Sequence, residues 1–451
     1  MKIQFLGGTG TVTGSKYLVT VGETRILVDC GLYQGLKELR LRNWDALPVD
    51  PKSIAAVVLT HAHIDHSGYL PLLVKKGFKG KIYCTPATQA QCGILLPDSG
   101  WLQEEEARFA NKHGFSKHHP ALPLYTQDDA LIALEKFTAK EYGVDFPLPA
   151  GVTCRFENAG HILGSALVRL KAAGQTLTFT GDIGRPNDPL LFPPEPLAAT
   201  DYLVVESTYG DRVHDSEPPE ERLAEIITEA AQNKSVVLVP AFSVGRTQLL
   251  LYYLAKLRRA NRIPEMPVFL NSPMSISATE IFRNFPSAHR LDAETCQQLR
   301  DAATYIRTPE ESRRLNETAG PMVIISANGM ASGGRILHHL KAFAPHENNV
   351  ILLTGFQAAG TRGAALQQGV KTLRIHGEEV PVRARVEMLH SLSAHADGNE
   401  IIAWLKRSEK PPLKTFVTHG EPESARALAE KIRVDLNWNA AVPEYLQEVE
   451  L

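Results

Sequence analysis

The segment that most constrains this chain is LTHAHIDHSGYLP, at Leu59–Pro71. It overlaps the end of an apolar run, Ala55–Leu59, whose composition predicts a buried strand. Within six residues it places three histidines and one aspartate, which are His61, His63, Asp65 and His66. Four such ligands in this spacing cannot all face one ion, so the segment indicates two neighbouring metal ions at the end of a strand.

The composition of the chain narrows its class and its partners. At 451 residues it is long enough for two or three domains, and its 43% hydrophobic and 22% charged residues are ordinary for a globular protein. No window approaches the roughly 18 apolar residues of a membrane helix. The opening MKIQFLGGTGTVTG lacks the apolar core of a signal peptide, so we expect a cytoplasmic protein without membrane contact.

Charge and cysteine content exclude two further possibilities. The formal net charge of −2 means that any nucleic acid is expected to bind in a local groove rather than over a broad basic surface. The five cysteines are scattered, odd in number and without a CxxC spacing. They argue against both a disulfide framework and a thiolate zinc site.

The middle of the chain repeats one unit, an apolar strand followed by a loop of small residues and a helix. The predicted strands Ser235–Val239, Met322–Ile325 and Val350–Leu353 lead into PAFSVGR, SANGMASGGR and TGFQAAGTRG. This alternation predicts a parallel, doubly wound sheet. The charged, Pro-bearing stretch Asp211–Pro219 is a candidate boundary before it. The parallel sheet is therefore expected to be inserted between two parts of a first domain.

Several candidate site residues share one position in the predicted structure. His61, Asp182, Glu206 and His419 each come just after an apolar strand, where α/β sheets gather their active-site groups. His161, in AGHILGS, lies in a loop of small residues where an imidazole can approach a metal. With the opening cluster, His161, Asp182 and His419 make seven ligands, which suit two zinc ions bridged by Asp182. Two ions about 3.5–4 Å apart hold a bridging hydroxide for in-line attack on a phosphate or carbonyl.

The motifs resemble the metallo-β-lactamase superfamily, whose signature matches HAHIDH at 61–66, and within it the β-CASP nucleases. The resemblance spans nearly the full chain. It implies an α/β fold, a metallo-β-lactamase αββα sandwich with an inserted doubly wound parallel-sheet β-CASP domain. The first part of the sandwich is expected at 1–207, the insertion at 208–372 and the last part at 373–451.

The resemblance also divides the ligands between the two zinc ions. It implies that His61, His63 and His161 hold one ion, and that Asp182 is shared. The other ion is implied to be held by Asp65, His66 and His419. Asp65 is in addition expected among the catalytic residues.

The later histidine in LSAHAD, His395, is the candidate general acid. Cleavage of a phosphodiester needs a protonated or otherwise stabilised leaving 3′-oxygen, and a histidine with a near-neutral pKa suits that task. Glu206, in VVESTYGDR, is expected to orient His395 and to raise its pKa. From spacing alone, His395 is equally well explained as a capping or core histidine; the family resemblance favours the catalytic role. His338, His339 and His376 are interpreted as structural.

The inserted domain supplies candidate anion sites. Helix N-termini after small-residue loops offer free N–H groups and the positive end of the helix dipole. The expected substrate-binding residues in these loops are Ser243, Arg246, Ser326, Asn328, Arg335 and Thr361. One segment departs from the family pattern, because NSPMS at Asn271–Ser275 has asparagine where an aspartate is expected before SPM.

The leading hypothesis is a zinc-dependent ribonuclease that acts on single-stranded RNA in a cleft between the two domains. Histidine at position 419 resembles the RNA-processing branch of the family, whereas the DNA-repair branch similar to Artemis tends to carry valine there. A small-molecule hydrolase, such as a thioesterase or lactonase, a DNA nuclease and a non-catalytic scaffold are the alternatives. Endonuclease and 5′-exonuclease action both stay open, and so does a homodimer.

Overall fold

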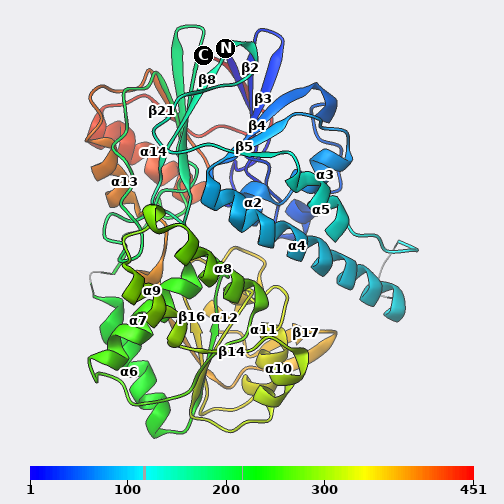
Figure 1. Ribbon diagram of the computed structural model, residues 1–451, viewed down its shortest axis with the longest axis vertical. Coiled ribbons are helices and arrows are strands. Elements are labelled where there is room, and N and C mark those ends of the chain that lie inside the picture. Colours follow the sequence, from blue (N-terminus) through cyan, green and yellow to red (C-terminus); the bar gives the residue numbers. More distant parts are fainter. Residues whose placement is uncertain (115–117, 216) are drawn as a thin grey trace. The chain divides into compact units, whose positions relative to one another are not determined.

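The chain forms two units, and both termini belong to the first. The structure, a computed structural model, describes residues 1–114, 118–215 and 217–451. Unit 1 comprises Met1–Val213 and His395–Leu451, and unit 2 comprises His214–Ala394. The last strand pairs with the first, and Figure 1 shows the two ends of the chain side by side. The middle of the sequence is therefore inserted into a unit that its two ends complete.

Unit 1 contains two seven-stranded sheets. The first has the order β22 (Glu448–Glu450), β1 (Lys2–Phe5), β2 (Tyr17–Val21), β3 (Thr24–Val28), β4 (Ile54–Val58), β5 (Lys81–Cys84) and β6 (Phe137–Ala139). Pairing is antiparallel from β22 to β3 and parallel from β3 to β6. Parallel pairing brings the carboxyl ends of β3 and β4 to the same edge of the sheet.

The second sheet of unit 1 repeats this change from antiparallel to parallel pairing. Its order is β21 (Ala440–Ala441), β20 (Lys414–Val417), β11 (Tyr202–Val205), β10 (Gln175–Phe179), β9 (Ala166–Ala172), β8 (Thr153–Asn158) and β7 (Phe146–Pro147). Strands β10, β11, β20 and β21 pair in parallel, and the others are antiparallel. The carboxyl ends of β10, β11 and β20 consequently lie side by side.

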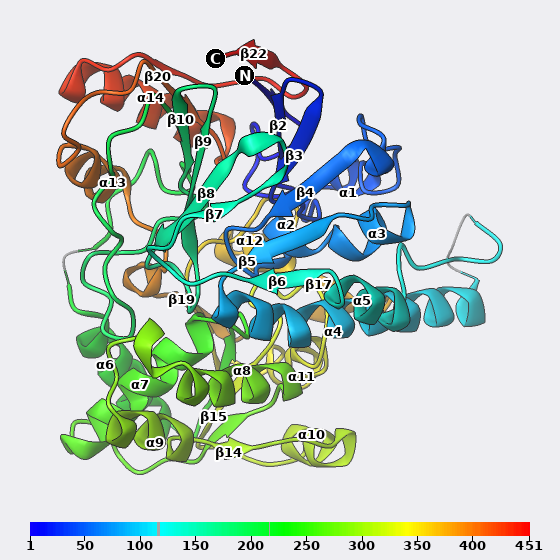
Figure 2. The same cartoon turned by 45° about the horizontal axis from the view of Figure 1, so that its top comes forward.

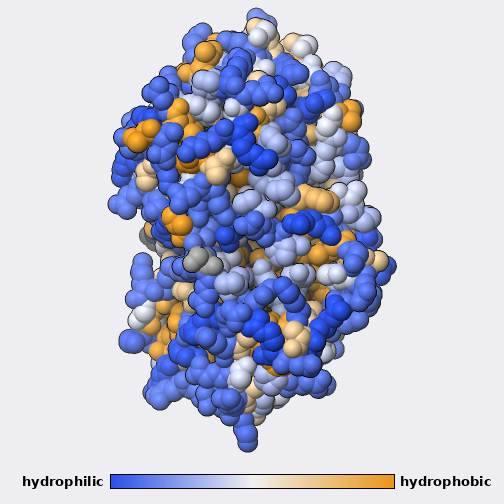
Figure 3. Space-filling model, turned by 90° about the vertical axis from the view of Figure 1, so that its left-hand side faces the viewer, coloured by the Kyte–Doolittle hydropathy of each residue, from blue (hydrophilic) through white to orange (hydrophobic). Residues whose placement is uncertain are grey.

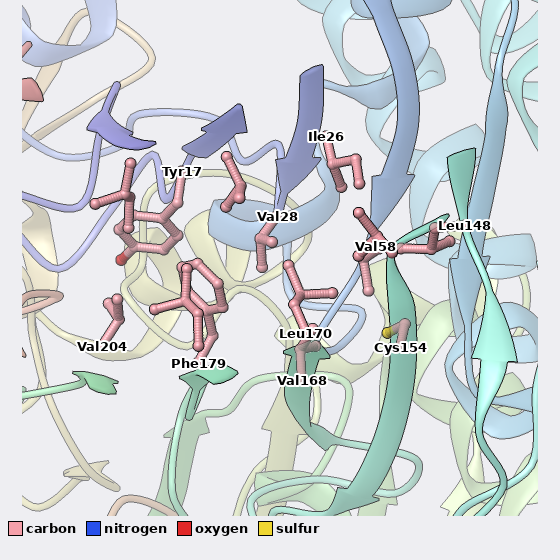
Figure 4. Close-up of a cluster of buried hydrophobic side chains, with 14 of the residues drawn as sticks. Tyr17, Ile26, Val28, Val58, Leu148, Cys154, Val168, Leu170, Phe179 and Val204 are labelled. Atoms are coloured by element: carbon pink, nitrogen blue, oxygen red, sulfur yellow. The ribbon is translucent and has the colours of Figure 1, made fainter. Parts of the chain in front are cut away.

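The two sheets face each other across an apolar core, shown in Figure 4. The first sheet contributes Ile26 and Val28, and the second contributes Leu170 and Phe179, all of them almost fully buried. Alternate residues of each strand point to one face of its sheet, so these side chains gather between the sheets. Each fully buried side chain of this size stabilises the fold by about 1.5–3 kcal/mol.

Helices cover the outer faces of the two sheets. Those associated with the first sheet are α1 (Lys37–Leu41), α2 (Ile64–Ser67), α3 (Leu70–Lys75), α4 (Pro86–His113) and α5 (Gln127–Leu134). Helices α13 (Gly398–Leu405) and α14 (Pro422–Leu436) pack on the second sheet, where Ile401 and Leu428 share a core cluster with Leu203. In Figure 2, α3 to α5 and α13 with α14 lie on opposite sides of the paired sheets. The predicted αββα sandwich is confirmed.

Unit 2 is built on a six-stranded sheet. Its order is β14 (Thr304–Tyr305), β13 (Val268–Leu270), β15 (Met322–Ser326), β12 (Val236–Pro240), β16 (Val350–Leu353) and β19 (Arg385–Met388). Every pair in it is parallel. The helices of unit 2 are α6 (Pro219–Gln232), α7 (Arg246–Arg259), α8 (Pro273–Asn284), α9 (Ala293–Asp301), α10 (Pro309–Asn316), α11 (Ile336–Phe343) and α12 (Arg362–Gln367). The prediction of an inserted parallel sheet is confirmed.

Both faces of this parallel sheet are covered. Val236 and Leu238 of β12 belong to a core cluster that also contains Ile336 of α11. Val237 and Val239 point to the other face, because side chains alternate along a strand, and they are equally buried. A sheet buried on both faces explains why β12, β15 and β16 read in the sequence as continuous apolar runs.

The boundary at the carboxyl end of the insertion differs from the expected one. The stretch 373–394, which we expected in the returning part of the first domain, lies in unit 2. Strand β19 in this stretch pairs with β16, and the hairpin of β17 (Thr372–Ile375) and β18 (Glu378–Pro381) adds apolar residues to the core of unit 2. At the other boundary, residue 216 of the stretch Asp211–Pro219 lies outside the described residues.

Polar and charged residues occur over the displayed surface and along the long helix α4. Figure 3 shows hydrophilic residues over most of the displayed face, with hydrophobic residues scattered among them. Helix α4 is long enough to span a bilayer, but it carries charged residues, among them Glu104, Glu105 and Glu106. None of the described helices is both long and apolar enough to cross a membrane.

Candidate active site

The predicted metal ligands gather at one edge of the unit 1 sandwich, from five segments. Asp182 follows β10, and His419 follows β20. The loop after β4 supplies two ligands, and α2, which continues it, supplies two more; these four are His61, His63, Asp65 and His66. His161 comes from the loop between β8 and β9. The parallel pairing of the central strands therefore assembles residues that are distant in sequence.

Two residues of this edge have an uncommon backbone conformation. Asp29, directly after β3, has a φ of 57°, and His419 has a φ of 48°. Left-handed conformations are rare for residues other than glycine and cost of order 1–3 kcal/mol when the surrounding structure enforces them. Both residues direct their side chains to the ligand cluster, so the strain occurs at the site itself.

The first ligand group contains three histidines and one oxygen of Asp182. The Oδ2 atom of Asp182 lies 3.3 Å from Nε2 of His61 and 3.4 Å from Nε2 of His161. Nδ1 of His63 lies 3.2 Å from each of those two nitrogens. The four ligand atoms thus converge on one small volume, with Asp182 almost fully buried.

The second ligand group lies against the other oxygen of Asp182. Its Oδ1 atom is 3.2 Å from Nε2 of His66 and 3.4 Å from Nε2 of His419. Oδ2 of Asp65 completes the group, at 3.9 Å from Nε2 of His66 and 3.8 Å from Nε2 of His419. One carboxylate therefore faces both groups, one oxygen to each.

These donor atoms fit a metal cofactor. The buried atoms Nε2 of His66 and Oδ1 of Asp182 lie 3.2 Å apart as a charge pair, but neither makes a geometrically acceptable hydrogen bond among the described residues. Orphaned buried donors and acceptors are rare, because each costs about 1–3 kcal/mol in lost solvation. Imidazole nitrogens and carboxylate oxygens are common ligands of zinc, and within each group the ligand atoms lie within 4.8 Å of one another.

The far side of each of three imidazoles has a hydrogen-bond partner of its own. Nδ1 of His66 lies 2.7 Å from Oδ2 of Asp29, and Nδ1 of His419 lies 2.8 Å from Oγ of Ser15. Nδ1 of His61 lies 3.0 Å from Oγ1 of Thr60, whose hydroxyl also donates to Asp29. Partners on Nδ1 fix the tautomer and direct the Nε2 lone pair to the metal position.

Burial and charge set the protonation of the ligands in opposite directions. Burial lowers the pKa of His63 and His161 well below the ordinary value and lowers that of His419 to about 4, so these imidazoles are neutral. Burial also acts to lower the pKa of His66, but the carboxylates of Asp182 and Asp29 raise it well above its usual range. Neutral imidazoles are the form that binds metal.

The Asp182 carboxylate is held ionised. Its burial acts to raise its pKa, but His419, His66 and His61 outweigh that effect and lower it well below the ordinary value. Burial instead raises the pKa of Asp65, and Asp182 adds to that effect, so the opposing influence of His66 and His61 does not outweigh it. A permanently negative Asp182 between two ligand groups is suited to share positive charge from both sides.

His395 and Glu206 form a pair beside the first group. Nδ1 of His395 lies 3.1 Å from both oxygens of Glu206, which is 1% exposed and accepts hydrogen bonds from the backbone N–H groups of Ile183 and Thr208. The ring of His395 lies 4.4 Å from that of His161 between centroids. Because Glu206 holds Nδ1, Nε2 is the nitrogen of His395 that can exchange a proton with a substrate.

The predicted substrate-binding residues gather at the carboxyl edge of the unit 2 sheet. They lie at the end of β15 or in the loops and helix starts after β12, β15 and β16, and are Ser243, Arg246, Ser326, Asn328, Arg335 and Thr361. Two hydrogen bonds join the loops after β15 and β16, from N–H of Gly363 to the carbonyl of Met330 and from Gln357 to the carbonyl of Gly329. The structure thus brings these segments together within unit 2.

Several of these side chains already have partners in the fold. The Arg335 guanidinium donates to Oδ1 of Asn271 at 2.8 Å and to the carbonyls of Ile306 and Arg307. Ser326 donates to the carbonyl of Asn271, and Thr361 caps α12 by accepting from N–H of Ala364. Their contact with substrate stays a prediction.

The remaining three differ from one another in their surroundings. Oδ1 of Asn328 accepts from N–H of Met330 at 2.7 Å. Arg246 is the first residue of α7 and is 6% exposed, beside Gly355. Oγ of Ser243 is buried and has no hydrogen-bond partner among the described residues. Among the hydroxyl groups of the six residues, it is therefore the one that can still form a hydrogen bond with a ligand.

Sequence reasoning missed the residues that orient the ligands. Asp29, Ser15 and Thr60 are not among the site residues that the sequence predicts. Asp29 obeys the rule that selected His61, Asp182 and His419, since it is a polar residue directly after an apolar strand. That rule could have found Asp29, whereas Ser15 is brought to His419 from 404 positions away in sequence by contacts with no local signal.

Three family models match the chain, in sequence order. The one described as metallo-beta-lactamase superfamily matches residues 9–216, and the one described as Beta-Casp domain matches 247–366. The third, described as Zn-dependent metallo-hydrolase RNA specificity domain, matches 379–443. The metal ligands of the loop after β4, with His161 and Asp182, fall in the first match, and His395 and His419 fall in the third.

Full-length relatives are similar over almost the whole chain. Ribonuclease TTHA0252 of Thermus thermophilus is 35% identical over 440 residues, covering 95% of both chains. Transcription termination factor FttA of Methanocaldococcus jannaschii is 30% identical over 469 residues, covering 100% of this chain and 71% of its own. An RNase J-like protein of the same organism is 30% identical over 447 residues, covering 98% and 97%.

A solved structure shares the fold at lower similarity. It is the crystal structure of a protein of unknown function from Enterococcus faecalis V583, with a TM-score of 0.55 and 14% identity. The alignment covers 100% of this chain and 99% of the other. At this identity the match supports the fold alone and nothing about activity.

Proposed function

The chain belongs to the metallo-β-lactamase superfamily and, within it, to the β-CASP ribonucleases, and we propose that it hydrolyses phosphodiester bonds of single-stranded RNA with two zinc ions. The observation that carries this proposal is the position of Asp182, whose two oxygens each face one ligand group at 3.2–3.4 Å. A carboxylate shared between two neighbouring ligand groups is what a two-metal hydrolase needs.

The chain's own residues have distinct roles in this proposal. His61, His63 and His161 hold one ion, Asp65, His66 and His419 hold the other, and Asp182 is shared. When bound, the ions supply Lewis acidity toward the phosphate and lower the pKa of water. Asp65, whose side chain is 19% exposed and whose pKa is raised by burial, is the carboxyl that can accept a proton from the attacking water.

His395 supplies a proton at the other end of the scissile bond. Glu206 fixes its Nδ1 through two contacts of 3.1 Å and favours the imidazolium form by its charge. His395 has 17% of its side chain exposed, against 0% for Glu206, so His395 is the member of the pair that can reach a substrate. A general acid of this kind contributes about 10²–10⁴-fold in rate.

RNA is favoured as the substrate by two observations of different kinds. Two of the full-length relatives carry the words ribonuclease or RNase in their names, and the model that matches 379–443 is described as an RNA specificity domain. The loops of unit 2 present helix starts with Ser243 and Arg246, which suit phosphate groups. Backbone contacts of this kind predict weak sequence preference.

The test is digestion of a 5′-labelled single-stranded RNA with and without a chelator. A DNA strand of the same sequence, an RNA duplex and a thioester are assayed in parallel. We expect metal-dependent cleavage of the single-stranded RNA and little action on the other three. Thioester hydrolysis without RNA cleavage would contradict the proposal. Product sizes distinguish the two modes, because a 5′-exonuclease releases a labelled mononucleotide and an endonuclease gives a ladder.

The cellular setting is also part of the proposal. We place the protein in the cytoplasm, because all five cysteines are free thiols and four of them are buried, as expected in a reducing compartment. A homodimer is proposed with it. Light scattering at two protein concentrations tests the homodimer. We expect a mass near twice the 49.6 kDa of one chain.

A further inference from the structure

A lysine is buried beneath the second ligand group. Lys16, directly before β2, is 2% exposed. Its Nζ atom donates to the carbonyl of Gly31 at 2.5 Å and to that of Gly14 at 3.4 Å. Among the described residues, no carboxylate lies within ion-pairing distance of this ammonium. A buried ammonium group without a carboxylate partner is rare, because the protein interior solvates a charge much less well than water does.

Aromatic rings and carbonyl dipoles take the place of a counter-ion. Nζ of Lys16 lies 4.7 Å from the centroid of the Tyr33 ring and 4.9 Å from that of Tyr69. Cation–π contacts at these distances stabilise an ammonium group only in part. Burial accordingly lowers the pKa of Lys16 to about 8, well below that of an exposed lysine. An apolar side chain here would stabilise the fold at least as well, so packing alone does not explain this lysine.

The two carbonyls that Lys16 joins flank the residues that hold the second ligand group. Between them in the chain, Ser15 donates its N–H to the carbonyl of Asp65 at 2.9 Å and contacts Nδ1 of His419 with its hydroxyl at 2.8 Å. On the other side, N–H of Cys30 donates to the carbonyl of His66 at 2.7 Å. Each ligand of the second group is thus one hydrogen bond from a segment that Lys16 holds.

The backbone segments at Ser15, Gly31 and Asp65 pack so closely that a small displacement of one would move the others. N–H of Gly31 donates to the carbonyl of Ser15 at 3.0 Å. A Cβ atom at Gly31 would lie 1.6 Å from the carbonyl oxygen of Asp65, so only glycine allows this approach. Release of the Gly31 carbonyl from Lys16 would therefore move the backbone against which Asp65 and His66 rest.

We propose that Lys16 is a positioning residue, which sets the geometry of Asp65, His66 and His419 by clamping the carbonyls of Gly14 and Gly31. The inference deepens the proposed function and rests on its two-metal centre. The first ligand group is held differently, since His61 contacts Thr60 and the N–H of His161 donates to Ser165. Loss of the clamp is therefore expected to weaken the second metal and spare the first.

The experiment measures metal affinity rather than activity. Metal-free full-length protein is titrated with zinc in competition with a chromophoric chelator, for wild type, Lys16→Met and Lys76→Met. Lys76 is the matched control, because it is exposed and its Nζ approaches the same Tyr69 ring from outside, at 5.9 Å from the centroid. Methionine keeps the length of the side chain and removes its donors and charge.

Lys76→Met is expected to bind both ions, each with the same affinity as wild type. Lys16→Met is expected to bind the first ion as wild type does and the second about 10–100-fold more weakly, which is the usual effect of losing an outer partner of a metal ligand. Equal affinity of wild type and Lys16→Met for the second ion overturns the proposal. So does equal weakening of both ions, which would indicate a general loss of structure.

A milder variant keeps the test decisive if Lys16→Met does not fold, as judged by circular dichroism of the metal-free protein. Lys16→Gln retains an amide donor for one of the two carbonyls, and its affinity for the second ion is expected to fall between those of wild type and Lys16→Met. A wild-type value for Lys16→Gln together with an unfolded Lys16→Met overturns the positioning role. Failure of the two-metal centre itself appears separately, as wild-type protein that binds fewer than two ions.

Discussion

Asp182 and His395 have separable tasks at the residue scale. Asp182 contacts both ligand groups, whereas His395 contacts Glu206 and lies beside the ring of His161. A substitution of His395 removes a proton donor and leaves all seven metal ligands in place. A substitution of His395 should therefore change the rate of RNA cleavage without changing the metal content.

His395→Ala is predicted to keep both metal ions and to lose RNA cleavage by about 10²–10⁴-fold, because a general acid contributes that much to rate. Elemental analysis of the purified protein and the cleavage rate of a labelled RNA are measured together. His346→Ala, at an exposed histidine of unit 2, is the control and should match wild type. Cleavage by His395→Ala at the wild-type rate would show that His395 is not the acid.

Lys16 also gives a pH-dependent prediction. Its pKa is about 8 in the folded chain and about 10.5 in the unfolded chain, so the folded state releases the proton first as pH rises. The unfolded state then binds more protons, and stability increases with pH between about 8 and 10.5. The free energy of unfolding of metal-free wild type, relative to Lys16→Met, should rise by about 3 kcal/mol over that range. Urea unfolding at both pH values measures it, and a constant difference would mean that Lys16 does not titrate in the fold.

At the scale of elements, strand β20 links the core to the site. Phe416 is 1% exposed, and its ring lies 5.2 Å from that of Phe5 in the opposite sheet, between centroids. Phe416→Ala should lower the free energy of unfolding by about 3–5 kcal/mol, because it leaves a cavity between the sheets. Leu413→Ala, at a residue 63% exposed before the same strand, should change it by less than about 0.5 kcal/mol. Urea unfolding of both variants measures these free energies. A similar decrease in the two variants would argue against the described core.

The asparagine that departs from the family pattern lies in a buried network of unit 2. Asn271 follows β13, and its Nδ2 lies 2.6 Å from Nε2 of His339 and donates to Ser312. Burial lowers the pKa of His339 to about 4, so this imidazole is neutral near pH 7. The sequence suggested only a lost carboxylate here, and the structure shows what the asparagine contacts instead.

Asn271→Asp is therefore predicted to raise the pKa of His339 by roughly one to three pH units, because a carboxylate at hydrogen-bonding distance favours the imidazolium. Arg335, which donates to Oδ1 of Asn271, would keep the new carboxylate ionised. Titration of the His339 ring signals by NMR in wild type and variant measures the shift. An unchanged midpoint would place His339 outside the influence of residue 271.

The predictability of elements depended on their apolar patterns. The strands Thr24–Val28, Lys81–Cys84, Tyr202–Val205 and Val350–Leu353 have the bounds that their apolar runs indicate. Short strands such as β13 and β14, and helices α8 to α10 near them in sequence, were not predicted. These segments alternate polar and apolar residues over few positions, and the pairing of β13 with β14 and β15 is a long-range contact without a local signal.

At the scale of the whole molecule, the ligand set could be predicted because its residues end apolar strands or stand in one dense motif. Its supporting residues could not. Ser15 and Lys16 act through the backbone of Asp65 and Gly31, and such contacts depend on how loops from separate strands pack together. The stretch 373–394 was expected with the first domain, and the pairing of β19 with β16, which groups it with unit 2, is likewise a long-range contact without a local signal.

The central claim is that the two ligand groups around Asp182 would hold two metal ions, both of which RNA cleavage requires, and one titration tests it most directly. Metal-free wild-type protein receives zinc in steps, and cleavage of a labelled single-stranded RNA is measured at each step. We predict little cleavage up to one equivalent per chain and a rise that is complete at two, because the bridged pair of ions is the reactive unit. Full cleavage at one equivalent, or cleavage by the metal-free protein, would contradict the account.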